Sequence, residues 1–441
     1  MSAQNPLFAS ALSTLKIPAL NPMQEAAVAA IVGHENVLLL SDTGSGKTIA
    51  FLLPLLQLLE KDNPSTQALI IVPSRELALQ IEGVWRGMAT GYKVTPCYGG
   101  HKREIEELSL TEAPALIIGT PGRLADHMRR GNIKPDGIRT LVMDEFDKTL
   151  ESGFVEEVQE IVSALTGLQK RVLTSATEGA DIPDFLGFQS PHRVDFLSST
   201  ASAALAVQIV SSTEKDKVET VFRLICQLGG RPMVVFCNHR ESVDRLSELL
   251  KERGILNAAY HGAMEQWERE AALGKFRNGT AYVLVTTDLA SRGLDVPHIR
   301  YIIHYHLPDT AESYTHRNGR TARVDTTGTA ILILGPDEKL PAYVPDTATT
   351  LELREGPVTL PDVPKWTTLV FAAGKKDKLN KVDVVGFLTG PGGARKEDIG
   401  LIESKDFVTY AAVRRSSMST VLHNIKDQKI KGRKIKVEVA K

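Results

Sequence analysis

Cysteine is scarce in this 441-residue sequence, which holds only Cys97, Cys226 and Cys237. Their scattered spacing argues against a disulfide framework and against a cysteine-based zinc site. Long apolar runs are also missing, because the longest, from Ile49 to Leu59, is too short to span a bilayer. The first residues lack the basic segment of a secretion signal. We therefore expect a cytoplasmic protein with no membrane association.

Net charge is nearly absent as well, since 52 Lys and Arg face 53 Asp and Glu. Its distribution is uneven. Residues 361–441 hold 17 basic and 9 acidic side chains, a surplus of +8, while residues 1–360 carry −9. A basic module attached to a mildly acidic body is typical of proteins that bind a polyanion. The composition is otherwise that of a globular protein, and the length suggests about three domains.

Through residue 335, short β-branched apolar runs alternate with amphipathic segments of helix length. Such alternation predicts α/β domains with parallel sheets and helices on both faces. The pattern occurs twice, separated by a Ser- and Ala-rich break at residues 196–212 that we interpret as a linker. The predicted strands are Val37 to Leu40, Ala68 to Val72, Ala115 to Ile118, Thr140 to Met143, Arg171 to Leu173, Met233 to Phe236, Tyr282 to Val285, Tyr301 to His304 and Thr329 to Leu334.

A second break, residues 341–364, holds five prolines and should tether a basic tail. From Trp366 onward, strand-like runs and two helical stretches follow in βαββαβ order, which is compatible with a small α+β domain of the RNA-recognition type. The predicted domains are residues 1–197 and 208–345, a linker over 346–363, and a tail domain over 364–441.

A glycine-rich loop carries the strongest chemical signal. The sequence SDTGSGKT, from Ser41 to Thr48, follows a predicted strand and precedes a predicted helix. Successive backbone N–H groups and a helix N-terminus can converge on phosphate there, with a lysine on the terminal phosphates and a hydroxyl on Mg²⁺. The predicted nucleotide contacts are Thr43, Gly44, Ser45, Gly46, Lys47 and Thr48.

Two acidic residues, Asp144 and Glu145, directly follow another predicted strand. Exposed acidic pairs are common, but beside a phosphate loop such a pair suits a metal partner and a base that orients water. We therefore predict Asp144 and Thr48 as Mg²⁺ ligands and Glu145 as the catalytic base, with Lys47 stabilising phosphate charge.

Three arginines, Arg317, Arg320 and Arg323, lie close together late in the second α/β domain. They could form a solvated basic patch, as charge runs usually do. Alternatively, arginines from a second domain could complete a nucleotide site when the domains close, which can accelerate hydrolysis by about 10³ to 10⁵.

An ordered series of motifs runs through the same region. It resembles the DEAD-box ATP-dependent RNA helicases over about residues 8–335, and the resemblance implies two tandem RecA-like domains that use ATP and Mg²⁺ to unwind or remodel RNA. The motifs are PSRELALQ (73–80), Gly99-Gly100, TPGR (120–123), DEFD (144–147), SAT (175–177), VVFCN (234–238), HGAMEQWER (261–269), TTDLASRGLD (286–295) and HRNGRTAR (316–323).

The resemblance also implies roles for individual residues at the nucleotide. Gln24 matches the family's adenine-reading glutamine, with Phe8 as a candidate stacking partner for the base. Asp295 matches the ribose contact and His316 joins the phosphate network. Arg320 and Arg323 match the γ-phosphate sensors. Ser175 and Thr177 match the link between the nucleotide site and RNA binding.

The implied RNA contacts come from both domains and from glycine or hydroxyl positions that suit close approach to a sugar-phosphate backbone. For Gly100 and Gly122, a simple turn-forming role is the alternative. The implied contacts are Arg75, Gly100, Thr120, Gly122 and Arg123 in the first domain, and Asn238, Gln266, Arg269, Thr287 and Gly293 in the second.

DEFD departs from the family motif by placing Phe146 where alanine is usual. The ring either fills a local apolar gap, which we favour, or changes the geometry of closure. Because Asp144, Glu145 and Asp147 are retained, metal binding, water activation and contact with the SAT segment should survive.

The tail contains the segments LVFAAGKKDKLNKVDVVGFLTG (369–390), DIGLIESKDFVTYAAV (398–413) and GRKIKVEV (432–439). With these segments it resembles the RNA-binding domain of the bacterial DEAD-box protein A (DbpA) group. That resemblance implies a structured target in large-subunit ribosomal RNA or pre-ribosomal particles, and we expect the protein to act as a monomer. Only Phe371, Phe407 and Tyr410 could stack bases on the sheet, and alternation places Tyr410 on the face opposite Phe407. We therefore expect loop and helix-end cations to bind RNA instead. The candidates are Lys375, Lys376, Lys378, Arg395, Lys396, Arg414, Arg415, Lys431, Arg433 and Lys434.

Two other functions remain open from the residues alone. A DNA translocase would share the phosphate loop and the arginines, although the RNA-type motifs and the tail argue against it. An RNA-binding assembly protein with incidental ATPase activity is the second.

Overall fold

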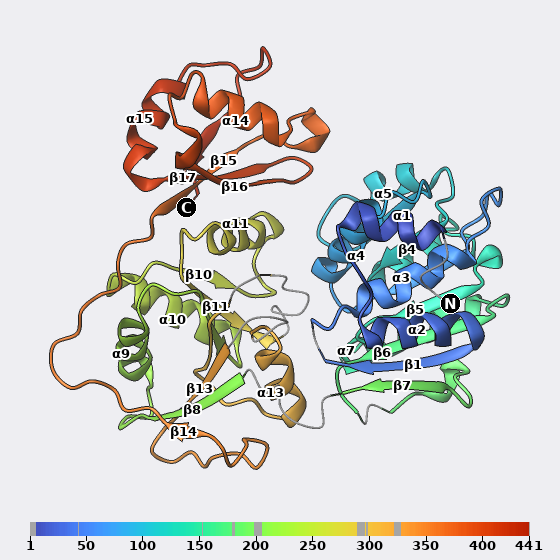
Figure 1. The fold of residues 1–441 in the computed structure, drawn as a ribbon, viewed down its shortest axis with the longest axis horizontal. Helices are drawn as coiled ribbons and strands as arrows, with labels where there is room; N and C mark the ends of the chain where they lie inside the picture. The colour runs from blue at the N-terminus through green and yellow to red at the C-terminus, as the bar shows by residue number, and fades with distance from the viewer. Residues whose placement is uncertain are drawn as a thin grey trace. The chain divides into compact units, whose positions relative to one another are not determined.

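The computed structural model describes residues 6–42, 44–151, 153–178, 181–197, 205–288, 296, 299–321 and 328–440. The chain divides into two compact units. The first contains one parallel sheet. The second contains another parallel sheet together with the tail domain (Figure 1). No helix among these residues is long and apolar enough to cross a membrane.

The first sheet has seven strands in the order β3-β4-β2-β5-β6-β1-β7, and every neighbouring pair is parallel. The five strands predicted for this domain are all present. The two that sequence reasoning missed, β3 and β7, lie at the sheet edges, where burial is less continuous. The strands are β1 (Asn36–Ser41), β2 (Ala68–Ile71), β3 (Val94–Cys97), β4 (Leu116–Gly119), β5 (Thr140–Met143), β6 (Lys170–Ser175) and β7 (His192–Phe196).

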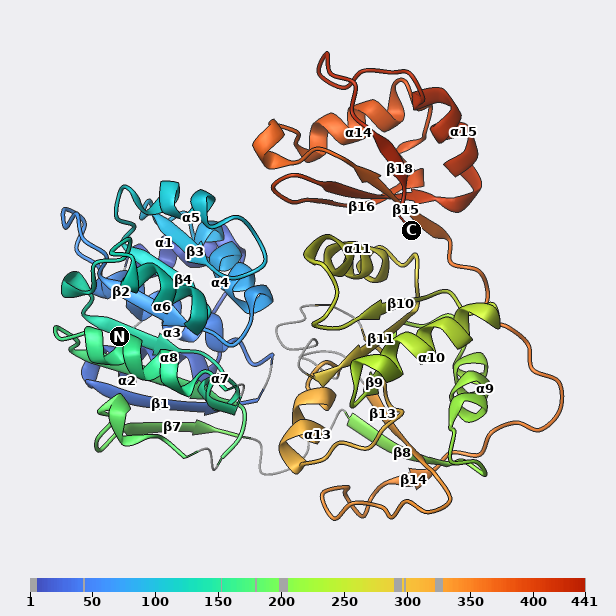
Figure 2. The ribbon, with the colours of Figure 1, turned by 180° about the vertical axis from the view of Figure 1, so that it is seen from behind.

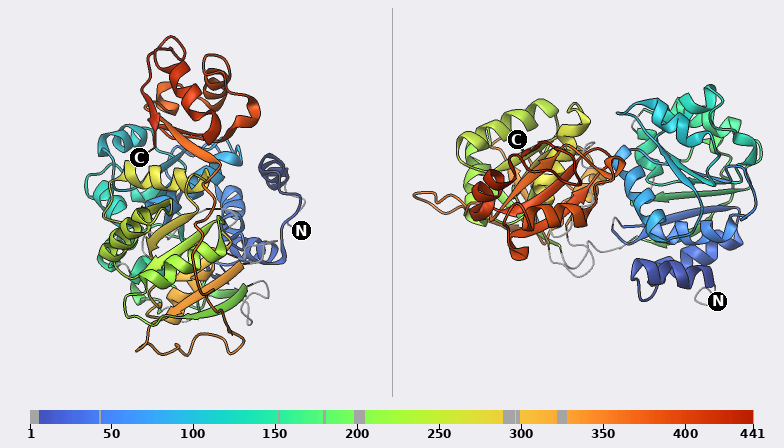
Figure 3. Two further views of the ribbon diagram at one scale, coloured as in Figure 1. Left: turned by 90° about the vertical axis from the view of Figure 1, so that its left-hand side faces the viewer. Right: turned by 90° about the horizontal axis from the view of Figure 1, so that it is seen from above.

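Helices cover both faces of this sheet, as the alternation of buried side chains requires. Ala68 and Ile70 of β2 face a core shared with helices α1 to α4, while Leu69 and Ile71 face a core shared with α5 to α8. Figures 1 and 2 show the helices on the two faces of the sheet from opposite sides, and Figure 3 adds a view along the sheet. The helices are α1 (Pro6–Leu15), α2 (Pro22–Gly33), α3 (Lys47–Leu58), α4 (Arg75–Gly87), α5 (Arg103–Leu110), α6 (Pro121–Arg129), α7 (Phe146–Glu151) and α8 (Val155–Ala164).

The second sheet is also parallel, in the order β10-β11-β9-β12-β13-β8-β14. Its described helices are α9 (Val218–Leu228), α10 (Arg240–Glu252), α11 (Gln266–Arg277) and α13 (Ala311–Asn318). The strands are β8 (Leu205–Ser211), β9 (Met233–Cys237), β10 (Asn257–Tyr260), β11 (Val283–Thr287), β12 (Tyr301–His304), β13 (Gly328–Leu334) and β14 (Thr349–Thr350).

Both predicted linkers need correction. The expected linker at residues 196–212 contains β8, which pairs with β13 over seven residues, so a domain start at residue 208 falls inside a strand. Its Ser- and Ala-rich surroundings conceal the strand pattern in the sequence. The expected linker over 346–363 also begins on the sheet, because β14 pairs with β8 and Leu351 and Leu353 pack against the core.

The tail domain has the predicted βαββαβ order and an antiparallel sheet in the order β16-β17-β15-β18. One sheet face packs on the two helices, with Leu369, Phe371 and Val413 in its core. The elements are β15 (Trp366–Phe371), α14 (Lys381–Thr389), β16 (Ile399–Ser404), β17 (Thr409–Arg414), α15 (Arg415–Ile425) and β18 (Val437–Val439).

The other face of the tail sheet rests on the C-terminal end of α11 (Figures 1 and 2). Arg277 donates to Glu403 at 2.8 Å. Asn278 donates to the Thr368 hydroxyl at 3.2 Å. Gly274 leaves room for the Tyr410 ring, because a Cβ there would lie 3.2 Å from its Cγ. An ion pair, a hydrogen bond and a buried aromatic ring therefore fix the tail to α11.

This contact answers the question of base stacking on the sheet. Phe371 is in the domain core and Tyr410 is 2 % exposed beneath α11, so neither presents a ring to RNA. Phe407 precedes β17 and is 58 % exposed, leaving one accessible aromatic of the three. The expectation of a thin stacking platform is borne out by burial.

Tyr410→Ala should weaken the contact between the tail and α11. Removing a buried aromatic ring costs about 3 kcal/mol or more, so calorimetry should show the tail unfolding in a separate transition at lower temperature. Phe407→Ala is the matched control, because an exposed ring should contribute less than about 0.5 kcal/mol. Equal melting behaviour of the two variants would contradict the contact.

Candidate functional site

The nucleotide-type residues of the first unit meet at one stretch of the sheet edge. The phosphate loop follows β1, the acidic pair follows β5, and SAT begins at the last residue of β6. These three strands are neighbours in the order β5-β6-β1, and their carboxyl ends point the same way. Ligands of parallel α/β sheets bind at such carboxyl ends. Three motifs far apart in sequence are therefore brought together.

The phosphate loop depends on two glycines with left-handed backbone conformation. Gly44 has a φ of 82° and Gly46 a φ of 92°, which a residue with a Cβ adopts only with strain. Gly46 is the N-cap of α3 and provides no side-chain cap. The N-terminal N–H groups of α3 are thus available to an anion.

Two side chains of the α2 N-terminus brace this loop. Gln24 donates through Nε2 to the Gly46 carbonyl at 3.2 Å, and Asn21 donates to the Ser45 carbonyl at 3.0 Å. Asn21 and Gln24 also form a capping box that starts α2. A Cβ on Gly46 would lie 2.4 Å from the Gln24 amide nitrogen, so glycine is required there for a second reason.

Lys47, the first residue of α3, is a buried cation at the centre of the loop. Its ammonium donates to the Asp42 carbonyl at 2.9 Å and also to the carbonyl of Ser41. Burial lowers the pKa of this ammonium, and the charges of Asp144 and Glu145 offset part of that shift. The acidic pair is therefore electrostatically linked to the lysine.

The acidic pair is held by Thr174 of β6. The Thr174 hydroxyl donates to the Asp144 carboxylate and accepts the backbone N–H of Glu145 at 3.3 Å. Glu145 has a φ of 52°, a strained conformation for a residue with a side chain. Backbone strain of this kind is retained where surrounding contacts hold a functional residue in place. Here the strained residue is the predicted catalytic base.

The donor set suits a hard divalent cation. Asp144 is buried, and burial together with the charge of Glu145 raises the pKa of its carboxyl group to about 6. A carboxylate destabilised in this way would be relieved by a cation beside it. The Thr48 hydroxyl, in the first turn of α3, adds an oxygen donor of the kind that Mg²⁺ uses in phosphate-loop proteins.

The SAT segment is connected to the acidic motif. Thr177 donates to the Asp147 carboxylate at 3.1 Å, and Ser175 accepts the backbone N–H of Thr177 at 2.9 Å. The predicted contact between Asp147 and SAT is therefore present. Phe146 is buried in the core beneath α7 and α8, which agrees with the gap-filling interpretation.

Phe8 requires a correction. It is 2 % exposed and packs in the core under α1, so its ring has no free face for a base, and the expected stacking does not fit. The sequence supplied an aromatic at a suitable distance before Gln24 but did not reveal which side of α1 is buried. The neighbouring Leu7 is the exposed one.

The predicted RNA contacts of the first unit form a second group on the same sheet edge. Arg75 follows β2, Gly100 follows β3 and Thr120 follows β4, and these strands are neighbours in the order β3-β4-β2. Arg75 donates to the Gly100 carbonyl at 3.5 Å. Thr120 is the N-cap of α6, which places Gly122 and Arg123 in its first turn.

The second unit repeats this division. Asn238 follows β9, Gln266 and Arg269 lie on α11 after β10, and Thr287 ends β11. The strand order β10-β11-β9 makes them neighbours. Arg269 lies over the Tyr260 ring, 5.3 Å from its centroid.

Arg317 and Arg320, which follow β12, are not a solvated patch. Arg317 is 1 % exposed and donates to the Asp288 carboxylate at 2.6 Å and to Asn238 at 2.9 Å. Arg320 is also buried, and its Nε donates to the His316 carbonyl at 3.4 Å. Arg317 therefore supports Asn238 internally. Thr43, Gly293, Asp295 and Arg323 lie outside the described residues.

The tail cations fall into two classes. Lys375 and Lys376 are exposed at a short 3₁₀ turn. Arg414 instead pairs with Asp398 at 2.8 Å, and Arg415 donates to the Pro364 carbonyl at 2.9 Å. The two arginines thus have structural contacts, and the two lysines are the stronger RNA candidates.

Several supporting residues escaped the sequence reasoning. Thr174 directly precedes SAT on β6, so its side chain lies on the face opposite that of Ser175. This alternation was the available signal in the sequence. Asn21 stands three positions before Gln24, and this capping-box spacing was the available signal. Asp288 and Glu106 pair with arginines that are 29 and 17 positions away, and such separations leave no local pattern.

Comparisons with known proteins agree with this architecture. Residues 21–185 match the DEAD/DEAH box helicase family, residues 216–325 the helicase conserved C-terminal domain, and residues 368–439 the DbpA RNA binding domain.

Similar proteins extend the match to nearly the whole chain. The ATP-dependent RNA helicase DbpA of Escherichia coli (strain K12) is 33 % identical, covering 98 % of this chain and 96 % of its own. The protein of the same name from Bacillus subtilis (strain 168) is 29 % identical, covering 95 % and 94 %. A solved structure of S. cerevisiae Dbp5 bound to RNA and ADP BeF3 has a TM-score of 0.67 at 25 % identity, covering 76 % and 88 %. This chain therefore belongs to the DEAD-box ATP-dependent RNA helicases, as a DbpA-type member with two RecA-like domains and a C-terminal RNA-binding domain.

Proposed function

We propose that this helicase remodels large-subunit ribosomal RNA during ribosome assembly, with the core binding RNA backbone and the tail selecting a structured site. The RNA target is supported by the match of the tail to the DbpA RNA binding domain. Coupling of hydrolysis to RNA is supported by the first sheet, where β5, β6 and β1 carry the nucleotide motifs and the neighbouring β3, β4 and β2 carry the RNA motifs. The basic tail adds the polyanion-binding surplus of +8. Three free cysteines and the ribosomal target are consistent with action in the cytoplasm.

At the nucleotide, Lys47 and the α3 N-terminus would hold the phosphates. Thr48 and Asp144 would hold Mg²⁺, which when bound neutralises phosphate charge. Glu145 would accept a proton from the attacking water, while Thr174 keeps its backbone in place. Gln24 would read adenine from its position against the phosphate loop.

The proposed hydrolysis also depends on residues of the second domain. Arg320 and Arg323 would sense the γ-phosphate, with His316 in the same network and Asp295 at the ribose. Because Arg320 is buried, we expect its guanidinium to hold a fixed position, unlike that of an arginine exposed on the surface. We also infer action as a monomer, because the exposed apolar side chains Leu108, Trp267 and Val382 come from three separate elements.

The RNA proposal assigns affinity and selectivity to different parts. Glycines and hydroxyls of the core would contact backbone without reading bases. In the tail, the sheet face is covered by α11, so selectivity would come from exposed cations such as Lys375 and Lys376.

Glu145→Gln should uncouple binding from hydrolysis. Glutamine keeps the side-chain shape but cannot accept the proton, so ATP turnover should fall by at least about a hundredfold. RNA binding in the presence of ATP should persist, and the complex should dissociate more slowly. Turnover and RNA release are measured on the same protein.

A control lies on the neighbouring helix α7. Glu151→Gln removes one carboxylate of the same kind from a more exposed position that pairs with Lys148 at 2.8 Å. It should leave turnover within about twofold. Normal turnover in Glu145→Gln would refute its assignment as the base.

The double variant Lys375→Gln/Lys376→Gln should reduce selectivity for a structured ribosomal RNA fragment over a scrambled RNA of equal length. Loss of two charge-assisted contacts predicts at least about a tenfold fall in that preference. The double variant Lys426→Gln/Lys429→Gln removes the same charge from another exposed tail segment and serves as control. Titrations of both RNAs test this, and equal losses in the two variants would place the effect in overall charge.

A further inference from the structure

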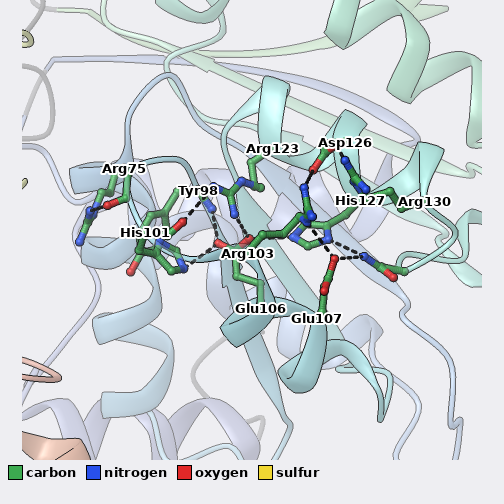
Figure 4. Close-up of polar contacts among 12 residues, drawn as sticks. Arg75, Tyr98, His101, Arg103, Glu106, Glu107, Arg123, Asp126, His127 and Arg130 are labelled. Atoms are coloured by element: carbon green, nitrogen blue, oxygen red, sulfur yellow. Dashed lines mark hydrogen bonds and ion pairs between the residues drawn. The ribbon is translucent and has the colours of Figure 1, made fainter.

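A buried carboxylate lies beneath the proposed RNA contacts of the first domain. Glu106, on α5, is 2 % exposed and accepts four donors, two on each oxygen (Figure 4). Oε1 accepts the Tyr98 backbone N–H at 2.8 Å and faces His101 Nε2 at 3.1 Å. Oε2 accepts Arg123 Nη1 at 2.8 Å and meets His127 Nε2 at 2.7 Å. All lone-pair positions of the carboxylate are used.

The protonation of this cluster follows from its hydrogen bonds. Asn132 Nδ2 lies 3.0 Å from His127 Nδ1 and also donates to Glu107, so Nδ1 accepts and the ring proton is on Nε2, directed at Glu106. Burial would raise the pKa of Glu106, but the hydrogen bonds from His101, His127 and Tyr98 and the charge of Arg123 outweigh it and lower the pKa to about 2. Glu106 is therefore an anion at physiological pH.

The cluster connects the two arginines proposed to contact RNA. Arg123 is held directly, and its second terminal nitrogen donates to the His101 carbonyl at 3.3 Å. His101 packs against the Tyr98 ring at a centroid distance of 4.6 Å, and Arg75 lies over that ring at 4.6 Å. Arg75 also donates to Gly100. One carboxylate thus supports Arg123 directly and Arg75 through two aromatic rings.

We propose that Glu106 is a positioning residue for RNA binding, whose buried charge fixes Arg123, the turn at Gly100 and Arg75 in the arrangement that receives the RNA backbone. The inference deepens the proposed function and rests on the role of Arg75, Gly100 and Arg123 as RNA contacts. Arg123 has five N–H donors, of which two are used by Glu106 and His101, so the others remain for phosphate.

A metal site is the competing explanation for this cluster. Cys97, Glu106 and His127 offer a sulfur, a carboxylate and an imidazole whose atoms lie within 4.8 Å of one another. However, the Arg123 guanidinium already neutralises the carboxylate and would repel a cation. Burial also raises the pKa of the Cys97 thiol well above its usual range, which disfavours the thiolate that a metal needs. The geometry favours positioning.

The sign of the effect of Glu106→Gln distinguishes positioning from simple electrostatics. Removing a negative charge from beneath the surface should by itself tighten RNA binding. A glutamine amide instead presents N–H donors to Arg123 or His127, so their contacts are lost. We expect the RNA concentration for half-maximal ATPase stimulation to rise about tenfold. The dependence of log affinity on log salt should become shallower by about 0.7, as for one lost phosphate contact to single-stranded RNA.

The matched control is Glu104→Gln, two residues earlier on α5, where the side chain is exposed. It removes the same charge and should leave RNA affinity unchanged or slightly tighter. In both variants the ATP half-saturation and the rate at saturating RNA should stay within about twofold, because the nucleotide residues follow other strands. A purely structural defect would lower the melting temperature and the saturated rate without this selective loss of RNA affinity.

Two further variants keep each failure separate. His101→Ala removes the ring that links Glu106 to Tyr98 and Arg75 while retaining the buried ion pair, so it should weaken RNA binding by less than Glu106→Gln does. Unchanged RNA binding in Arg123→Gln would refute the contact itself. If Arg123→Gln binds RNA more weakly but Glu106→Gln and His101→Ala bind it normally, the Arg123 contact stands and the positioning role of Glu106 is refuted. Zn²⁺ that raises the melting temperature of the parent protein, but not of Glu106→Gln, would overturn the proposal in favour of a metal site.

Discussion

The parallel direction of the strands is the constraint on which both sites depend. Because all strands of a sheet end at the same edge, motifs separated by more than a hundred residues meet without any special loop. The order β5-β6-β1 gathers Lys47, Asp144 and Ser175, and the order β3-β4-β2 gathers Arg75, Gly100 and Thr120. Both groups belong to one sheet, so the proposed nucleotide site and the proposed RNA contacts share one rigid support.

Four buried charges at or beneath the carboxyl edges of the two sheets have identified partners. Lys47 is held by loop carbonyls, Asp144 by Thr174, Glu106 by four donors and Arg317 by Asp288. Leaving such a group unpaired is costly, whereas a satisfied one holds its neighbours in a single geometry. In the second domain, the buried Arg317 donates to Asn238 and holds it in place, as Glu106 holds Arg123 in the first domain.

Much of this organisation could be predicted from the sequence. Buried central strands such as β1 and β5 are continuous apolar runs, and glycine-rich and acidic motifs directly follow them. Strands with weak patterns were missed, such as β10, whose sequence NAAY is short and rich in small residues, and β8, which was interpreted as linker. The burial of Phe8 and the partners of Glu106 depend on tertiary packing. Neither leaves a periodic signal in the sequence.

We expect ATP hydrolysis in this protein to depend on contact with an RNA backbone. The most direct test compares steady-state ATP hydrolysis in the presence of single-stranded RNA and single-stranded DNA of the same sequence and length. If the core contacts sugar hydroxyls as well as phosphates, as proposed, RNA should stimulate hydrolysis at least about tenfold more than DNA. Equal stimulation by DNA, or a rate independent of either nucleic acid, would contradict the account.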